Sequence, residues 1–193
     1  MQFEQDGRVV SDPDDIVAKF NDFFVNIGKN ISSKIPSSLA PFSSFLKNPI
    51  SSFFTFDSCD PDEIVNIVKN FSGKDSFGYD MIPTSLVKCC INQISEPLSA
   101  LVNRSFQTGL FSDQLKIAKV VPLFKGGNIS SFENYRPISL LPCFSKILEK
   151  AAFSRIQTWL DTNNIISASQ FGFHAKHSTY MALLDMCRSV STR

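Results

Sequence analysis

The stretch that most constrains the fold is residues 116–141, KIAKVVPLFKGGNISSFENYRPISLL. β-branched and aromatic residues dominate its first part, which predicts a strand from about 116 to 124. Gly126 and Gly127 then permit the backbone of a turn, and a polar loop leads to a second extended run at 135–141. The sequence therefore predicts a β-hairpin.

Three cations lie along this predicted hairpin, namely Lys119, Lys125 and Arg136. Cations fixed along an apolar-backed strand pair suit a polyanion such as a nucleotide or a nucleic acid. An ordinary surface hairpin with solvated charges also explains the pattern, and spacing alone favours that simpler interpretation.

Helical periodicity accounts for most of the remaining chain. Ser11 or Asp12 before Pro13, and Asp60 before Pro61, combine an N-cap residue with proline at the first helical position. The fold class is therefore predicted to be α+β and rich in helix. Helices are expected from 13 to 35, from 60 onward, from 83 with an interruption at Pro97 and an end at Gly109, from 142 to 161, and from 178 to 190.

Composition narrows the class of protein. At 193 residues the chain is long enough for one domain with a real core, and its 19 phenylalanines suggest a large core or an exposed apolar face that a partner would cover. No apolar run approaches the roughly 20 residues of a membrane span, and no signal-peptide pattern occurs. We expect an intracellular protein without a membrane partner, in the nucleus or the cytoplasm. The cysteines are expected to be reduced and mostly buried, because no CxxC occurs and their number is odd: Cys59, Cys89, Cys90, Cys143 and Cys187.

The net charge of +1 is unevenly distributed. Residues 1–115 hold 9 Lys and Arg against 14 Asp and Glu, a net charge of −5, whereas residues 116–193 hold 10 against 4, a net charge of +6. The basic part begins at the predicted hairpin, which favours a nucleic-acid or nucleotide partner there.

Motifs for common catalytic chemistries do not occur. The chain has no phosphate-binding P-loop, no H-E-x-x-H, no G-x-S-x-G and no deaminase signature. His174 and His177 have a spacing that can serve a metal, but no carboxylate or cysteine pattern accompanies them, and histidines on a loop or surface are the favoured interpretation. We expect neither a metal site nor catalytic residues in this chain.

Four segments in order carry a family resemblance: FGYDMIP (77–83), KIAKVVPLFKGGN (116–128), NYRPISLLPCFSKILEK (134–150) and QFGFHAKHST (170–179). Together they resemble the front part of the reverse transcriptases of non-LTR, LINE-like retrotransposons, close to the jockey and CR1-like branch. FNDFFVNIG at 20–28 also looks like the connector between the endonuclease and polymerase of such proteins.

The resemblance implies a right-hand polymerase. Residues 1–56 would be a helical connector with a linker rich in Ser, Pro and Phe, and residues 57–193 a partial reverse transcriptase domain with the fingers and an incomplete palm. Partners in a complete enzyme would be an RNA template, a DNA primer and an incoming dNTP, with Mg²⁺ present only there and no cofactor in this chain.

The resemblance also assigns roles to residues. Lys125 and Arg136 would bind the triphosphate of the dNTP, with Arg136 using its planar fork. Lys119 and Lys146 would contact template or nucleotide phosphates. Gln170, Phe171 and Gly172 would line a pocket on the template side, although a structural turn under the hairpin explains Gln170 and Phe171 equally well.

Some positions depart from the family pattern. Gly126 stands where a second lysine is usual, His174 where arginine is usual, and Leu115 where tryptophan is common, while Gly78-Tyr79 replaces a glycine-proline pair. The catalytic aspartates, palm, thumb and endonuclease are expected outside this chain, which predicts a fragment that is inactive alone. The alternatives are a non-catalytic nucleic-acid-binding module and a non-functional retrotransposon remnant.

Overall fold

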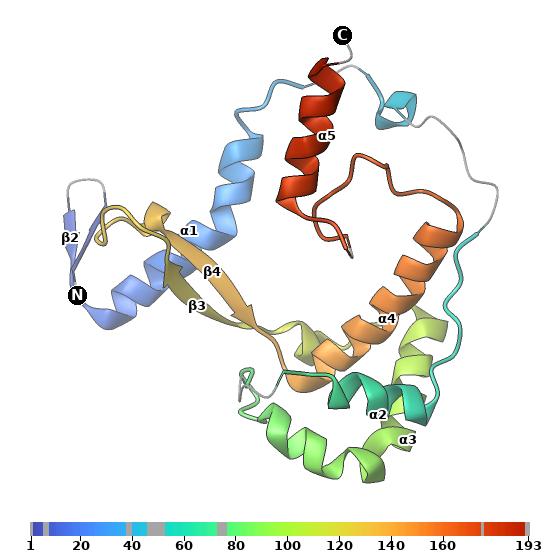
Figure 1. Cartoon of the computed structure of the whole chain (residues 1–193). Coiled ribbons are helices and arrows are strands. Elements are labelled where there is room, and N and C mark those ends of the chain that lie inside the picture. The colour runs from blue at the N-terminus through green and yellow to red at the C-terminus, as the bar shows by residue number, and fades with distance from the viewer. Residues whose placement is uncertain are drawn as a thin grey trace.

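Helices dominate the computed structural model, which describes residues 2–5, 8–37, 40–45, 53–72, 77–174 and 176–191. Two small antiparallel sheets accompany them, so the predicted α+β, helix-rich class is confirmed at that level. Figure 1 shows α1 and the larger hairpin on one side of the molecule and α2, α3 and α4 packed together on the other. The elements in order are β1 (Phe3–Gln5), β2 (Arg8–Val10), α1 (Pro13–Ser32), η1 (Phe42–Phe45), α2 (Pro61–Lys69), α3 (Thr84–Thr108), η2 (Asp113–Lys116), β3 (Lys119–Phe124), η3 (Phe132–Asn134), β4 (Tyr135–Leu140), α4 (Cys143–Thr162) and α5 (Thr179–Ser191).

The main core lies between α2, α3 and α4. Apolar side chains at helical spacing meet there and lose almost all contact with solvent, which is the main favourable term in folding. The most deeply buried of them are Ile64 and Val68 of α2, Val87 and Ile91 of α3, and Ile147 and Ala151 of α4.

The proline-based helix starts are confirmed. Asp12 caps α1 by accepting hydrogen bonds from the backbone N–H groups of Asp14 and Asp15 at 3.0 and 3.1 Å. Asp60 caps α2 through the N–H of Glu63 at 2.7 Å. A cap and its proline need only neighbours in the sequence, so this signal is readable without tertiary structure.

The predicted end of α1 at about residue 35 is three residues too late. The helix ends at Ser32. After the capping residue Ser33, the N–H groups of Lys34 and Ile35 donate to carbonyls only three residues earlier. The chain therefore tightens into a turn before it reaches Pro36.

The predicted interruption at Pro97 is also wrong, because Pro97 lies inside α3, which is one continuous helix of 25 residues. Proline has no N–H, so the carbonyl four residues earlier loses its hydrogen-bond donor. The helix bends at this point but does not end when the helical turns on both sides of the proline are packed against other elements. Val87 and Val102, one on each side of Pro97, are both buried in the same core. Figure 1 shows α3 changing direction along its length. Gly109 ends the helix with φ of 67°, as predicted.

Two short strands lie near the N-terminus, at residues 3–5 and 8–10. β1 and β2 form an antiparallel pair, and Phe3 and Val10 are buried. Three-residue strands are too short for a periodic signal, and Phe3 is buried by contacts with residues more than 100 positions away.

The last helix leaves its apolar side chains exposed. Met181 and Leu184 of α5 are each 41% exposed, and Met186 and Cys187 are exposed as well. The periodicity identified an amphipathic helix correctly but could not say whether another described element covers it. Leu86 and Leu101 of α3 are exposed apolar residues as well.

The prediction that most of the five cysteines are buried is wrong, because only two of them are. Cys59 and Cys143 are buried, Cys90 is half-buried, and Cys89 and Cys187 are exposed. Burial raises the pKa of the Cys59 thiol to about 12, so this side chain is a neutral core residue.

The segment before α2 is bound to α3 through its backbone. The N–H of Cys59 donates to the amide oxygen of Asn103 at 2.7 Å, and the Asn103 amide donates back to the Cys59 carbonyl at 2.8 Å. The hydroxyl of Ser99 donates to the same carbonyl at 2.7 Å. These bonds explain why a buried face of α3 carries polar side chains.

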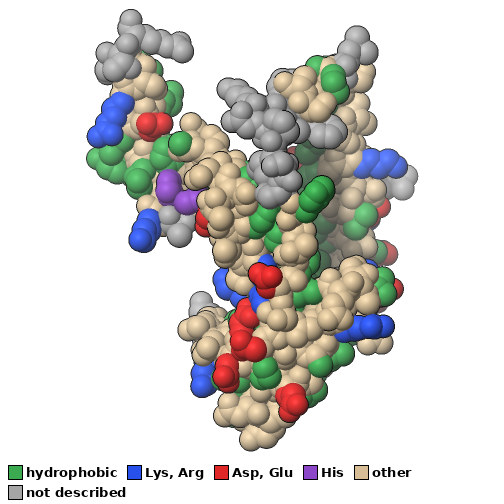
Figure 2. All heavy atoms as spheres, turned by 90° about the vertical axis from the view of Figure 1, so that its right-hand side faces the viewer, with side chains coloured by type: hydrophobic (Ala, Val, Ile, Leu, Met, Phe, Trp, Pro, Cys, Tyr) green, Lys and Arg blue, Asp and Glu red, His purple; other side chains and the backbone are tan. Residues whose placement is uncertain are grey.

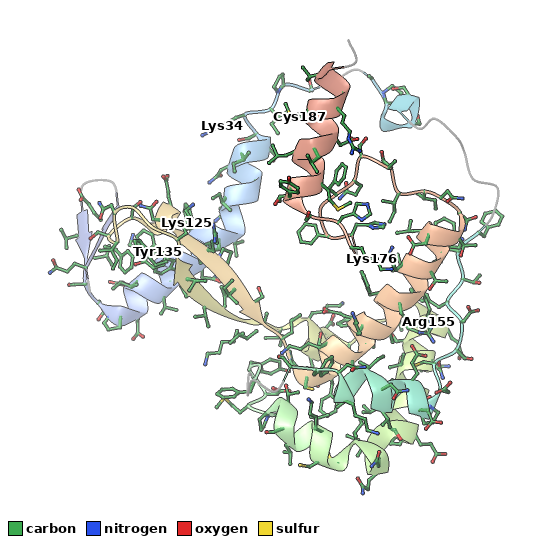
Figure 3. The ribbon with its side chains drawn as sticks, viewed as in Figure 1. Lys34, Lys125, Tyr135, Arg155, Lys176 and Cys187 are labelled. Carbon is green, nitrogen blue, oxygen red and sulfur yellow. The ribbon has the colours of Figure 1, made fainter. Side chains whose placement is uncertain are left out.

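Arg155 joins α4 to α2 (Figure 3). Its two terminal nitrogens donate to the two carboxylate oxygens of Glu63 at 2.8 Å each. The same guanidinium donates to the carbonyls of Asp57 and Ser58 at 2.6 and 2.7 Å and lies over the ring of Phe106. The bond to Arg155 lowers the pKa of Glu63. The Arg155 side chain therefore donates four hydrogen bonds that join α4 to α2 and to residues 57–58.

No helix within the described residues has both the length and the apolar character needed to cross a bilayer.

We expect Arg155→Ala to destabilise the chain by about 2–4 kcal/mol, because it leaves Glu63 and two carbonyls without their donor. Arg155→Lys should recover only part of this, since an ammonium cannot form the bidentate fork. Urea unfolding curves followed by circular dichroism measure the difference.

The same pair predicts a pH dependence. The pKa of Glu63 is lower in the folded chain than in the unfolded chain. The ionised Glu63 therefore contributes fully to folding stability above the ordinary glutamate pKa of about 4.3, and this stability is lost as pH falls through the lower folded pKa. The gap in stability between the wild type and Arg155→Ala should therefore narrow in acid. A gap that does not change between neutral and acidic pH would contradict the ion-pair interpretation.

Candidate functional site

The predicted hairpin forms from β3 and β4. The two strands pair antiparallel, from Lys119 opposite Leu140 to Phe124 opposite Tyr135. The first strand begins at Lys119 and not at 116, because Asp113–Lys116 forms the short helix η2.

Side chains alternate between the two faces of the hairpin. One face is turned toward α1, and a groove of about 520 Å³ between them is lined by Phe20 and Phe24 of α1 together with Val120, Pro122, Pro137 and Ser139 of the hairpin. The opposite face, which we call the cationic face, carries Lys119, Val121, Leu123, Arg136, Ile138 and Leu140.

Lys119 and Arg136 therefore share one face of the hairpin. Arg136 pairs with Leu123, four residues along β3 from Lys119, which separates the two cations by roughly 13 Å along the strands. Both are exposed. Their apolar neighbours Val121 and Ile138 are also about two fifths exposed, so the face is a mixed apolar and cationic surface.

Lys125 lies at the tip, directly after β3. Its backbone N–H donates to the carbonyl of Asn134 at 2.9 Å, which extends the ladder by one pair. Gly126 and Gly127 follow with φ of 115° and 93°, and the Asn134 side chain closes the loop with a bond of 2.9 Å to the carbonyl of Asn128. Figure 3 shows Lys125 and Tyr135 near each other at this end of the hairpin.

At the base, the hairpin meets the loop that precedes α3. The ammonium of Lys119 lies 5.7 Å from the centre of the Phe77 ring, a cation–π contact. Gly78 packs against the backbone that follows β4, so closely that a Cβ there would lie 2.6 Å from the nitrogen of Pro142. Phe77 belongs to the FGYDMIP segment, but its sequence position alone does not indicate this contact with Lys119.

Lys146 lies one turn into α4, near the same loop. The pKa of the nearby Cys143 thiol is raised, mainly because the thiol is buried. The hydrogen bond with Thr84 and the charge of Lys146 act in the opposite direction, and the charge of Asp80 adds to the increase. Lys146 and Asp80 are thus close enough to Cys143 to act on the same group. Of the predicted contact residues, Lys119 and Lys146 lie at the base of the hairpin, and Lys125 and Arg136 lie toward its tip.

The 170–172 segment makes local hydrogen bonds and ring contacts, and Gln170 and Gly172 also line a groove beside Phe153 and Gln157 of α4. The side-chain amide of Gln170 donates to the carbonyl of Gly172 at 2.9 Å, and the ring of Phe171 lies 5.6 Å from that of His177. The Nδ1 atoms of His174 and His177 are 3.0 Å apart in the same turn. These contacts fit the structural-turn interpretation, and the predicted template contact stays a prediction.

The uneven charge along the sequence is also uneven in space. Acidic side chains gather on the face shown in Figure 2, over the lower helical part, and Asp60, Asp62 and Glu63 lie together at the start of α2. The hairpin that carries Lys119, Lys125 and Arg136 lies on the opposite side, at the left of Figure 1. An anionic partner is thus favoured at the hairpin and disfavoured near the start of α2.

Comparison with known proteins agrees with the resemblance. No family model matches the chain. The RNA-directed DNA polymerase from mobile element jockey of Drosophila melanogaster is 27% identical over 136 residues, which is 70% of this chain and 15% of that protein. The probable RNA-directed DNA polymerases from transposon BS and transposon X-element of the same organism are 30% and 28% identical over 69% of this chain and 15% of each relative.

The chain spans about 15% of the length of these relatives. Its resemblance to the reverse transcriptases of non-LTR retrotransposons is confirmed.

The base of the hairpin gives a stability prediction with an internal control. Gly78→Ala should destabilise the chain by about 1–3 kcal/mol, because its Cβ would meet backbone atoms that cannot rotate away. Gly28→Ala, in the exposed middle of α1 with no atom within 4 Å of the new Cβ, should stabilise it by about 0.5–1 kcal/mol. Thermal unfolding of the two variants beside the wild type measures both signs. Equal effects would contradict the close packing of Gly78.

Proposed function

We propose that this relative of retrotransposon RNA-directed DNA polymerases forms the fingers part of the reverse transcriptase of a mobile element. In this proposal the hairpin binds the phosphates of the incoming dNTP near its tip and those of the template and primer near its base. The observation that carries the proposal is the shared cationic face of Lys119 and Arg136, with Lys125 one pair beyond the strand.

The chemistry of the cations supports these roles. The guanidinium of Arg136 can donate two parallel hydrogen bonds to one phosphate, whereas Lys125 offers a compact point charge. Among the described residues, no carboxylate forms an ion pair with Lys119, Lys125 or Arg136. Their charge is therefore available to an anionic ligand.

Phosphoryl transfer in a complete polymerase uses Mg²⁺ held by carboxylates. Within the described residues, no three side chains of the kinds that bind metals come together. We therefore assign no residue here to the metal, and the proposed part of this chain is to bind and orient phosphates. Cations fixed before the ligand arrives need no reorganisation when charge develops on it.

The proposal predicts that Arg136→Ala weakens binding of phosphate ligands by about tenfold or more, the value of a charge-assisted hydrogen bond. Fluorescence anisotropy with a labelled RNA–DNA primer–template and, separately, with a labelled dNTP measures this and distinguishes the two sources of phosphate. Arg104→Ala, which removes an exposed arginine of α3, is the matched control and should bind as the wild type does.

Binding of the primer–template should also weaken with salt, and the slope should become shallower by about one charge in Arg136→Ala. Equal losses in Arg136→Ala and Arg104→Ala would mean that net charge, and not the hairpin, determines affinity. Absence of binding to both probes would refute the proposed function.

A further inference from the structure

The tip of the hairpin is held by four aromatic rings that we call the aromatic clamp: Phe3, Phe20, Phe132 and Tyr135. Phe3 stacks on Phe132 at 4.7 Å between ring centres, and Phe20 meets Phe132 and Tyr135 edge-on at 4.7 and 5.0 Å. Each ring is at most 8% exposed. Two of the rings come from the N-terminal segment and two from the hairpin, so the clamp joins parts of the chain that are far apart in sequence.

Two hydrogen bonds fix the same loop. The N–H of Glu4 donates to the carbonyl of Ser130 at 3.0 Å, which attaches β1 to the loop before β4. The hydroxyl of Tyr135 donates to the carbonyl of Ile129 at 2.8 Å. The loop is thus bound from the N-terminal segment on one side and from β4 on the other.

The rest of the hairpin has little cover of its own. Val121, Leu123 and Ile138 on the cationic face are 40%, 54% and 42% exposed. A two-stranded hairpin without further packing is only marginally stable in water. The clamp under α1 is therefore the principal source of order for the tip.

The clamp also determines where the cations point. Arg136 directly follows Tyr135, and Lys125 directly follows Phe124, whose ring lies 5.4 Å from that of Tyr135. Successive side chains of a strand point to opposite faces, so burying Tyr135 under α1 turns Arg136 to the solvent side. A slip of one residue would bury the cation and expose the ring.

We propose that the N-terminal segment, residues 3–32, is a built-in positioning element for the phosphate-binding hairpin, and that Phe20 is its central positioning residue. Phe20 touches Tyr135 and not the ligand, and it acts by fixing the register and face of β4. The ligand part of this inference rests on the proposed function, while the ordering of the hairpin by α1 stands on the contacts alone.

The test compares Phe20→Ala with Ile31→Ala in the full chain. Ile31 is an exposed apolar residue of the same helix outside the clamp. Hydrogen–deuterium exchange is followed in peptides from β3 and β4, with peptides from α2, α3 and α4 as the internal reference. Binding of the labelled primer–template and of the labelled dNTP is measured on the same samples.

We expect exchange in β3 and β4 to accelerate by about tenfold or more in Phe20→Ala, because a large buried ring is removed, while the reference helices are unchanged. Affinity for the probe that the wild type binds should fall by about tenfold. Ile31→Ala should match the wild type in both measurements, and Phe20→Leu, which keeps most of the apolar volume, should lie closer to the wild type than Phe20→Ala does.

Unchanged exchange in β3 and β4 of Phe20→Ala would overturn the inference. Faster exchange with unchanged affinity would overturn the link to binding and leave the proposed function intact. A wild-type chain that binds neither probe would refute the proposed function and the ligand part of the inference, while exchange would still decide whether α1 orders the hairpin. If exchange also accelerates in the reference helices of Phe20→Ala, Phe20→Leu takes its place. Faster exchange in β3 and β4 of Phe20→Leu than of Ile31→Ala would then support the inference, and equal exchange would overturn it.

Discussion

The packing of Phe20 against Tyr135 is the contact on which the candidate site depends. Successive side chains of a strand point to opposite faces, so the burial of one ring determines the faces of all the remaining side chains in β4. Tyr135 is buried under α1, and Arg136 is therefore exposed on the opposite face. The strand pair itself does not choose between its faces, because both carry apolar residues. An N-terminal helix, and not the hairpin sequence alone, decides which face presents the cations.

The two ends of the hairpin are held in different ways. At the tip, aromatic rings and two hydrogen bonds fix the loop that carries Lys125. At the base, Gly78 lets one backbone approach another, and Phe77 lies beside Lys119. The base continues into α4, which Arg155 joins to α2 and to the backbone of residues 57–58. The cations thus lie on a surface attached at one end to the helical core and at the other to the N-terminal segment, which is the kind of fixed arrangement that recognition of a phosphate requires.

One departure from the pattern of related polymerases has a structural explanation. Gly126 stands where the family resemblance led us to expect a second lysine, and its φ of 115° lies in a region that residues with a side chain rarely adopt. A lysine in this backbone would be strained. The tip therefore gains a tight turn and keeps a single lysine, Lys125, beside it. Any loss of charge is local, because Arg136 and Lys119 remain on the cationic face.

The sequence by itself determined the local features. It predicted the hairpin, the cap at Asp60 and the end of α3 at Gly109, since each of these depends on residues close together in the chain. The cap of α1 was narrowed to Ser11 or Asp12, and four segments in order carried the resemblance to retrotransposon reverse transcriptases. Only the tertiary structure decided that Pro97 bends α3, that Phe3 is buried, that Arg155 pairs with Glu63 and that α5 leaves its apolar residues exposed. Periodicity shows that a face is apolar or charged, but it does not specify the distant partner that covers it. Burial and ion pairing depend on that partner, and so does the face on which Arg136 is exposed.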